Sequence, residues 1–244
     1  MKEMQIVEVG RKERKGFLRN LSVTGWLILV NVVFFIAAII LLYMDENFLN
    51  YIALKPVDVM HGKYLWTFLT SMFMHAPGQG VFAFLSVHMI VNMFVLFSLG
   101  GLMEKIIGRK RFLWFYLLAG IFAGLMFVLL SYFFGNGGIG ENIFGSPDIP
   151  AVGASGAIFA IAGLFVLLTP KMRFSIIFFP FFTLPAIIMI PLVLFGTWIV
   201  SYSAGFGIGN TAHLGGFLFG AVYGVYLRKK YSKKVKMISG YFAR

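Results

Sequence analysis

Four polar residues of types that can perform acyl transfer interrupt the long apolar stretches of this 244-residue sequence. They are His88, Asn92, Ser155 and His213. A serine hydroxyl attacks a carbonyl carbon when a nearby base removes its proton, and histidine is the most frequent base. The attack creates an oxyanion, which needs hydrogen-bond donors. The residue types therefore predict Ser155 as a nucleophile and His213 as its base. His88 and Asn92 are the candidate oxyanion donors.

The immediate neighbours of these residues favour such roles. His88 and Asn92 are four residues apart, so on a helix they share one face and can donate to a single point. Ser155 lies in Gly153-Ala154-Ser155-Gly156-Ala157, where small neighbours leave its hydroxyl accessible. A helix that began there would add unpaired N–H groups and the positive end of its dipole. Structural alternatives exist, because the His–Asn pair can join two helices and the serine can bond back to its own helix.

A stripe of glycines follows His213 and predicts how it reaches the serine. The glycines lie three, seven and eleven residues after it, on one face of a helix; they are Gly216, Gly220 and Gly224. Such a stripe allows another helix to pack very closely. If it meets the small residues Gly156 and Ala160, the imidazole is brought to Ser155. The alternative is a structural histidine that is hydrogen-bonded to a neighbour.

The elements that must position these residues are apolar and helical. Hydrophobic residues make up 59% of the chain and charged residues 12%, whereas a soluble domain carries about 25% charged residues. Apolar runs of roughly 17 to 23 residues are long enough to cross a bilayer as helices. Six spans are predicted, near 25–43, 86–103, 112–134, 151–168, 184–202 and 211–227. The predicted fold is an all-α membrane protein whose one domain, 25–229, lies between basic tails at 1–24 and 230–244.

The basic residues give the direction of the spans. All Lys and Arg except Lys55 and Lys63 lie in the two tails or in the connections after the second and fourth spans. Since Lys and Arg stay on the cytoplasmic side, both termini are predicted to be cytoplasmic. The candidate residues near the starts of the second, fourth and sixth spans then lie at similar depth, in the outer half of the membrane. The net charge of +12 is assigned to membrane flanks and not to nucleic-acid binding.

The connections also carry predictions. Residues 44–85 are semi-polar and are expected to form short amphipathic helices in the outer interface. Residues 135–150 are rich in glycine and lack Lys and Arg, as in an external loop. The start of the fifth span is the least defined boundary, because Pro180, Pro185 and Pro191 interrupt the apolar run. The first apolar run lacks the cleavage site of a secretory signal and is taken as a retained span.

The acidic residues decide between classes of protease. None of the nine lies in the outer half of a predicted span, so no carboxylate is expected beside His213. We therefore predict a Ser-His dyad whose imidazole is held by packing, with Phe159 as a platform under the ring or else as ordinary core. An aspartyl protease needs two acids at one depth, and a zinc protease needs His-Glu-x-x-His; the sequence has neither. Since cysteine and nucleotide-binding motifs are also absent, no metal or cofactor is predicted.

Together these residues resemble the rhomboid family of intramembrane serine proteases. The matching motifs are Gly153-Ala154-Ser155-Gly156, Ala212-His213 followed by spaced glycines, and His88-x-x-x-Asn92. Met74-His75 and Gly100-Gly101-Leu102-Met103-Glu104 are also similar to family patterns. The resemblance covers residues 25–227, with the serine and histidine motifs in the family's order and spans.

The resemblance implies a serine endopeptidase in the cell membrane that needs no cofactor. Ser155 would attack a peptide bond in or near a transmembrane segment of a protein substrate, and His213 would act as base and then as acid. Oxyanion stabilisation would come from the Ser155 amide, His88 and Asn92, and Asn210 would support the base. Water would enter from the extracytoplasmic side, and substrate would arrive laterally from the lipid bilayer past the fifth span.

Two departures and two alternatives qualify the resemblance. Trp66-Thr67 stands where the family often has Trp-Arg, and Phe159 stands where bacterial relatives often have Tyr. A non-catalytic rhomboid-like protein that binds transmembrane clients usually lacks the serine or the histidine, and both are kept here. A transporter or channel would carry polar residues through the full depth of the membrane, whereas these cluster in one half.

Overall fold

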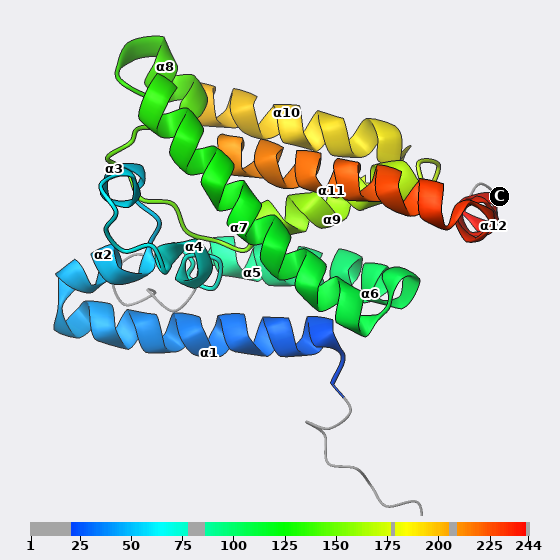
Figure 1. The fold of residues 1–244 in the computed structure, drawn as a ribbon, viewed down its shortest axis with the longest axis horizontal. Helices are drawn as coiled ribbons and strands as arrows, with labels where there is room; N and C mark the ends of the chain where they lie inside the picture. The colour runs from blue at the N-terminus through cyan, green and yellow to red at the C-terminus, as the bar shows by residue number, and fades with distance from the viewer. Residues whose placement is uncertain (1–20, 78–85, 177–178, 205–208, 243–244) are drawn as a thin grey trace, which may run out of the picture.

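The fold is a bundle of long helices joined by short ones (Figure 1). The computed structural model describes residues 21–77, 86–176, 179–204 and 209–242. The long elements are α1 Val23–Met44, α5 Val87–Val95, α6 Gly101–Ile107, α7 Arg109–Phe134, α9 Ser155–Leu168, α10 Ala186–Ala204 and α11 Asn210–Lys230. A π-helical turn, η4 Leu96–Gly100, joins α5 to α6 in one continuous segment. A helix is therefore present at each of the six predicted places.

Four helical segments in the described part of the chain are long and apolar enough to cross a bilayer. They are Val23–Met44, Val87–Ile107, Arg109–Phe134 and Ala186–Ser203. The protein is thus a multi-pass membrane protein. The 14 residues of α9 extend only about 21 Å, less than the thickness of the hydrocarbon layer. In α11, Asn210, His213 and three basic residues in the last turn reduce the mean hydropathy.

The fourth predicted span starts too early, because α9 begins at Ser155 and not at residue 151. The N–H and C=O groups of Ala151 pair with those of Leu54 at 2.9 and 3.0 Å, and the N–H of Gly153 donates to the carbonyl of Ser71 at 2.8 Å. These bonds hold an extended segment against the first loop. Hydropathy does not distinguish an extended apolar segment from a helical one, which explains the error.

The fifth predicted span also starts too early. Residues 184 and 185 belong to an antiparallel hairpin of β1 Arg173–Ile176 and β2 Phe179–Pro185, in which Phe174 pairs with Leu184. The Arg173 guanidinium donates to the hydroxyl and the carbonyl of Thr183 at 2.9 and 2.6 Å. α10 begins only after Pro185, whose ring removes a backbone donor. The all-α prediction therefore misses one small sheet.

Short helices occupy the connections. The first connection contains η2 Glu46–Phe48, α2 Leu49–Ile52, α3 Pro56–Met60 and α4 Thr67–Thr70, which confirms the prediction of short helices there. The connection after α7 contains α8 Gly138–Phe144, and the basic C-terminal segment forms α12 Ser232–Tyr241; neither helix was predicted. In Figure 1, α1 starts at the same end of the bundle at which α12 lies, while α2, α3 and α8 lie at the other end.

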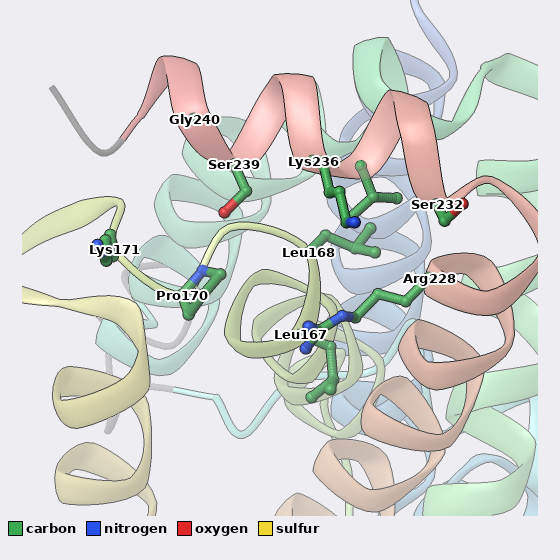
Figure 2. Close-up of a pocket in the computed structure, with 10 residues that line it drawn as sticks. Leu167, Leu168, Pro170, Lys171, Arg228, Ser232, Lys236, Ser239 and Gly240 are labelled. Carbon is green, nitrogen blue, oxygen red and sulfur yellow. The ribbon is translucent and has the colours of Figure 1, made fainter.

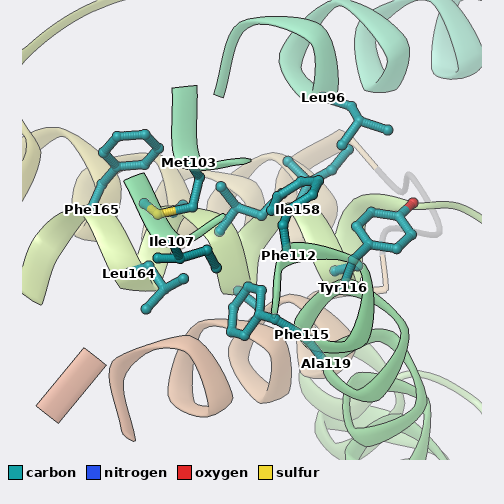
Figure 3. Close-up of a cluster of buried hydrophobic side chains, with 14 of the residues drawn as sticks. Leu96, Met103, Ile107, Phe112, Phe115, Tyr116, Ala119, Ile158, Leu164 and Phe165 are labelled. Atoms are coloured by element: carbon teal, nitrogen blue, oxygen red, sulfur yellow. The ribbon is translucent and has the colours of Figure 1, made fainter. Parts of the chain in front are cut away.

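The largest cluster of buried side chains joins α6, α7 and α9 (Figure 3). Met103, Phe112 and Phe165 in this cluster are fully buried. Next to it, the buried carboxylate of Glu104 accepts hydrogen bonds from the backbone N–H groups of Val23 and Thr24 at 2.9 and 2.8 Å. A carboxylate at this position satisfies the unpaired donors that begin α1. Glu104 therefore fastens α1 to α6.

Candidate active site

The side chains of Ser155 and His213 meet across the α9–α11 interface. Nε2 of His213 lies 2.8 Å from Oγ of Ser155, which is hydrogen-bonding distance. His213 is buried, and Ser155 is half-buried at the first position of α9. The backbone N–H groups of the first turn of a helix have no partner within it, so they and the helix dipole face an anion placed beside the serine.

Glycines bring the two helices close enough for this contact. A Cβ atom built on Gly216 would collide with the carbonyl oxygen of Gly156, and one built on Gly220 would collide with that of Ala160. In the other direction, a Cβ on Gly163 would collide with the carbonyl oxygen of Phe217. The prediction that the glycine stripe meets the small face around Gly156 and Ala160 is confirmed.

Packing holds the imidazole of His213. The ring of Phe159 stacks on it with centroids 4.4 Å apart and an interplanar angle of 26°. Nδ1 of His213 is buried and has no hydrogen-bond partner among the described residues. If Nε2 is to accept the serine proton, the ring proton must sit on Nδ1. The phenyl ring of Phe159 thus lies against the face of the imidazole.

The ring of His88 lies beside Gly153, two residues before the serine. The N–H of Ala76 donates to its Nδ1 at 3.3 Å, so the proton of the neutral ring belongs on Nε2. A Cβ built on Gly153 would lie 3.0 Å from this Nε2 and 3.7 Å from Oγ of Ser155. The two groups therefore flank one small space. Gly153 has φ +128, a conformation that glycine adopts readily, and its missing side chain leaves that space open.

The two predicted asparagines, Asn92 and Asn210, lie close in sequence to His88 and His213 but, among the described residues, do not contact the serine. Nδ2 of Asn92, which is buried one turn after His88, donates to the His88 carbonyl at 2.8 Å. This bond uses one of its two N–H groups and leaves the second. Asn210 is the first residue of α11; it is buried, and its Oδ1 has no partner among the described residues. The structure brings Ser155, His213, Phe159 and His88 together, whereas no contact within the described residues joins either asparagine to the serine or to His213.

Comparison with known families shows that the candidate residues all lie within one family domain. The model of the Rhomboid domain matches residues 62–230, a segment that contains all six candidate residues. The chain belongs to the rhomboid family.

Curated relatives carry the same family name. Presenilin-associated rhomboid-like protein, mitochondrial, from Homo sapiens and its counterpart from Pongo abelii are each 33% identical to this rhomboid over 144 residues. Those alignments cover 57% of this chain and 34% of each relative. Presenilin-associated rhomboid-like protein A, mitochondrial, from Danio rerio is 28% identical over 150 residues. This alignment covers 56% of this chain and 33% of that relative. The chain thus spans about a third of the length of the curated relatives it matches.

A second polar cluster in this rhomboid was only partly found from the sequence. His75 is fully buried, its ring lies 5.2 Å from that of His88 between centroids, and its Nε2 lies 3.0 Å from Oδ1 of Asn31. In the sequence, the only indication of His75 was that Met74-His75 resembles a family motif. Asn31 lies in the middle of the first predicted span, so the reasoning that polar residues in spans are functional could have found it. The cluster therefore contacts His88 through the ring of His75.

Proposed function

We propose that this protein is an intramembrane serine endopeptidase that hydrolyses peptide bonds in or near transmembrane segments of other proteins. The observation that carries the proposal is the 2.8 Å contact between Nε2 of His213 and Oγ of Ser155. A serine hydroxyl is a weak nucleophile until an adjacent base can take its proton. Here the imidazole of His213 lies within hydrogen-bonding distance of the serine hydroxyl, and the serine is the first residue of a helix.

The proposed catalytic unit is a Ser-His dyad. Nε2 of His213 takes the proton from Oγ as the oxygen attacks the substrate carbonyl, and it later gives that proton to the leaving amine. In a triad, a carboxylate orients the histidine through Nδ1. In this chain Nδ1 has no partner within the described residues, and the stacked ring of Phe159 supports the imidazole instead. Packing against Phe159 therefore takes the orienting role.

The proposed oxyanion site lies between α5 and the start of α9. The amide of Ser155 supplies one donor, and Nε2–H of His88 supplies a second from across the space that Gly153 leaves open. Asn92 contributes the N–H that its bond to the His88 carbonyl does not use. Asn210 supports the base from the start of α11, where its buried Oδ1 has no hydrogen-bond partner among the described residues.

We also propose six spans with both termini in the cytoplasm and the site open to the extracytoplasmic side of the cell membrane. The distribution of Lys and Arg supports this direction. The position of α12 at the end where α1 starts supports an even number of spans (Figure 1). α9 and α11 would then be spans that neighbouring helices shield from lipid. Such shielding is compatible with the short length of α9 and with the polar start of α11.

The proposed partners are transmembrane proteins that enter laterally from the bilayer. α10 carries many exposed apolar side chains, among them Ile188, Leu192 and Phe195, and so offers lipid or another helix a compatible surface. A scissile carbonyl within a helix is hydrogen-bonded and shielded. Preferred substrates should therefore have small residues at the cut and helix-weakening residues beyond it.

The experiment that tests this proposal is labelling with a fluorophosphonate probe. Detergent-solubilised wild type should be modified at Ser155 only, and the Ser155→Ala and His213→Ala variants should not react. The wild type should also cleave a single-span substrate, and either substitution should abolish that cleavage. Failure of a folded wild type to react, under conditions in which a control serine hydrolase reacts fully, would favour the non-catalytic, client-binding alternative. Cleavage by His213→Ala would refute the dyad.

A further inference from the structure

A second hollow lies at the far end of α9 from the serine. It has a volume of about 420 Å³ and lies between the C-terminal end of α9, the last turn of α11 and α12 (Figure 2). Ten residues line it, among them three cations, two serines and three aliphatic side chains. Ser155 begins α9 and Leu168 ends it, so about 20 Å of helix separate this pocket from the proposed active site.

The pocket carries positive charge without a counter-charge. Lys171, Arg228 and Lys236 line it, and none of the ten lining residues is acidic. No Asp or Glu follows Asp148 anywhere in the sequence, so the rest of the chain supplies no acidic side chain. Within the described residues, none of the three cationic side chains has a hydrogen bond or an ion pair. An anion would therefore meet three unpaired cations there.

Neighbouring cations differ, because they already contact aromatic side chains. Nζ of Lys230 donates to the Tyr226 hydroxyl at 2.7 Å and lies over the ring of Tyr231. Arg111 donates to the Tyr231 hydroxyl at 2.9 Å. Neither of these two cations lines the hollow. This arrangement distinguishes the pocket from the general basic surface of the C-terminal segment.

The remaining walls favour a ligand with both a phosphate and a hydrocarbon part. The hydroxyls of Ser232 and Ser239 add hydrogen-bond donors, and the fork of Arg228 can bind two phosphate oxygens at once. Leu167, Leu168 and Val235 supply an apolar wall. Figure 2 shows Arg228 reaching from α11 over Leu167, and Lys236 descending from α12 toward the same space. The volume falls in the range of small-molecule sites, which is about 300–1,000 Å³.

The position of the pocket matches the level of lipid head groups. It lies where α9 and α11 end, and in Figure 1 α12 is seen nearly end-on, so its axis crosses the direction of α11. A basic helix in this orientation lies along a membrane surface. Basic pockets between helices at the cytoplasmic surface are suited to anionic head groups. A soluble phosphate compound would use the cations and hydroxyls but would leave the apolar wall uncovered.

We propose that this pocket binds the phosphate of an anionic phospholipid, with the start of the acyl chains against Leu167, Leu168 and Val235. Bound lipid would join α12 to the ends of α9 and α11. The pocket rests on the proposed membrane direction but not on proteolysis, so its test and the test of the protease activity can fail separately.

The test measures lipid binding to the full chain in detergent by native mass spectrometry. Dioctanoyl phosphatidylglycerol should bind one site, whereas dioctanoyl phosphatidylcholine and glycerol 1-phosphate should each bind at least about tenfold more weakly. The K171Q/R228Q/K236Q variant should lose at least about tenfold in affinity for phosphatidylglycerol. The matched K229Q/K233Q/K234Q variant loses the same charge outside the pocket and should bind like the wild type.

A second variant distinguishes loss of the pocket from misfolding and from a general effect of charge. Ser239→Trp fills the hollow without changing any charge and should also abolish binding. Thermal melting and gel filtration of each variant report whether it is folded. Equal loss in both charge variants would overturn the pocket in favour of general attraction to the basic surface. Equal affinity for glycerol 1-phosphate would overturn the assignment to lipid, and wild-type binding by both pocket variants would overturn the site itself.

Discussion

At the residue scale, the site depends on two histidines that hold their protons on different nitrogens. The N–H of Ala76 donates to Nδ1 of His88, which leaves the proton on Nε2, the nitrogen next to Gly153. His213 turns Nε2 toward the serine hydroxyl and must keep its own proton on the buried Nδ1 to act as a base. One imidazole is thus arranged to donate and the other to accept. In the proposed mechanism the same residue type therefore has opposite functions, because the neighbouring backbone and packing differ.

Gly153 should be required for activity. Gly153→Ala places a Cβ 2.9 Å from Cε1 of His88 and forces a side chain into a conformation with φ +128, so it displaces the proposed oxyanion donor. We expect the rate of substrate cleavage to fall by about tenfold or more. Gly101→Ala is the matched control, because a Cβ there meets no atom within 4 Å. If Gly153→Ala cleaves substrate as fast as Gly101→Ala, the missing side chain of Gly153 is not required for activity.

Asn92 should contribute to the rate but should not be essential. If its second N–H stabilises the oxyanion, Asn92→Ala should slow cleavage on the order of tenfold to several hundredfold, as loss of one such donor does elsewhere. The substrate KM should change little, because the bond forms in the transition state. Steady-state kinetics on a single-span substrate check both quantities. An unchanged kcat would remove Asn92 from the site.

At the element scale, the α9–α11 interface connects stability with catalysis. Gly220→Ala directs a methyl group at the carbonyl oxygen of Ala160 and must separate the two helices. We expect a loss of about 1–3 kcal/mol in the free energy of unfolding, together with weaker fluorophosphonate labelling, because His213 moves away from Ser155. Gly196→Ala in α10 meets no atom within 4 Å and serves as the control. Full stability with full labelling in Gly220→Ala would contradict the close-packing argument.

A hydrogen bond from Trp198 tethers α10 to α8, and this tether should slow the entry of substrate. Nε1 of Trp198 donates to the Ile143 carbonyl at 2.9 Å. Trp198→Phe removes the bond and keeps a ring, so cleavage of a transmembrane substrate should become about two- to tenfold faster. Labelling by the small fluorophosphonate should stay the same, because this reagent does not need lateral entry. Trp114→Phe, an exposed tryptophan in α7, is the control; faster labelling by Trp198→Phe would point to a change at the serine instead.

The sequence predicted helix positions well where a long apolar run had clear ends, and poorly where it did not. The first and third spans match α1 and α7 within a few residues. The predicted starts of α9 and α10 lie before the helices begin, because an extended segment paired to Leu54 and a hairpin ending at Pro185 are as apolar as the helices that follow them. The meeting of Ser155 with His213 could be predicted because the glycine stripe specifies which helix faces pack together. The contact between His75 and His88 could not, because it depends on how the first loop folds.

At the scale of the whole molecule, the two ends of the bundle differ in charge and in proposed task. Ser155 lies at the start of α9, toward the end where α2, α3 and α8 gather, and the basic pocket lies beyond the last residue of the same helix (Figure 1). The helix dipole of α9 points its positive end toward the serine. This asymmetry supports the proposed direction, in which the basic end faces the anionic cytoplasmic surface.

This direction can be tested directly because the chain has no cysteine, so each introduced thiol is unique. Single variants Asn47→Cys and Glu141→Cys place a thiol in η2 and α8, whereas Lys110→Cys and Lys233→Cys place one at the start of α7 and in α12. A membrane-impermeant maleimide added to intact cells should label the first pair only. The second pair should react after the membrane is permeabilised. Labelling of Lys233→Cys in intact cells would show that the C-terminal end is outside, and the serine would then open to the opposite side of the membrane from the one proposed.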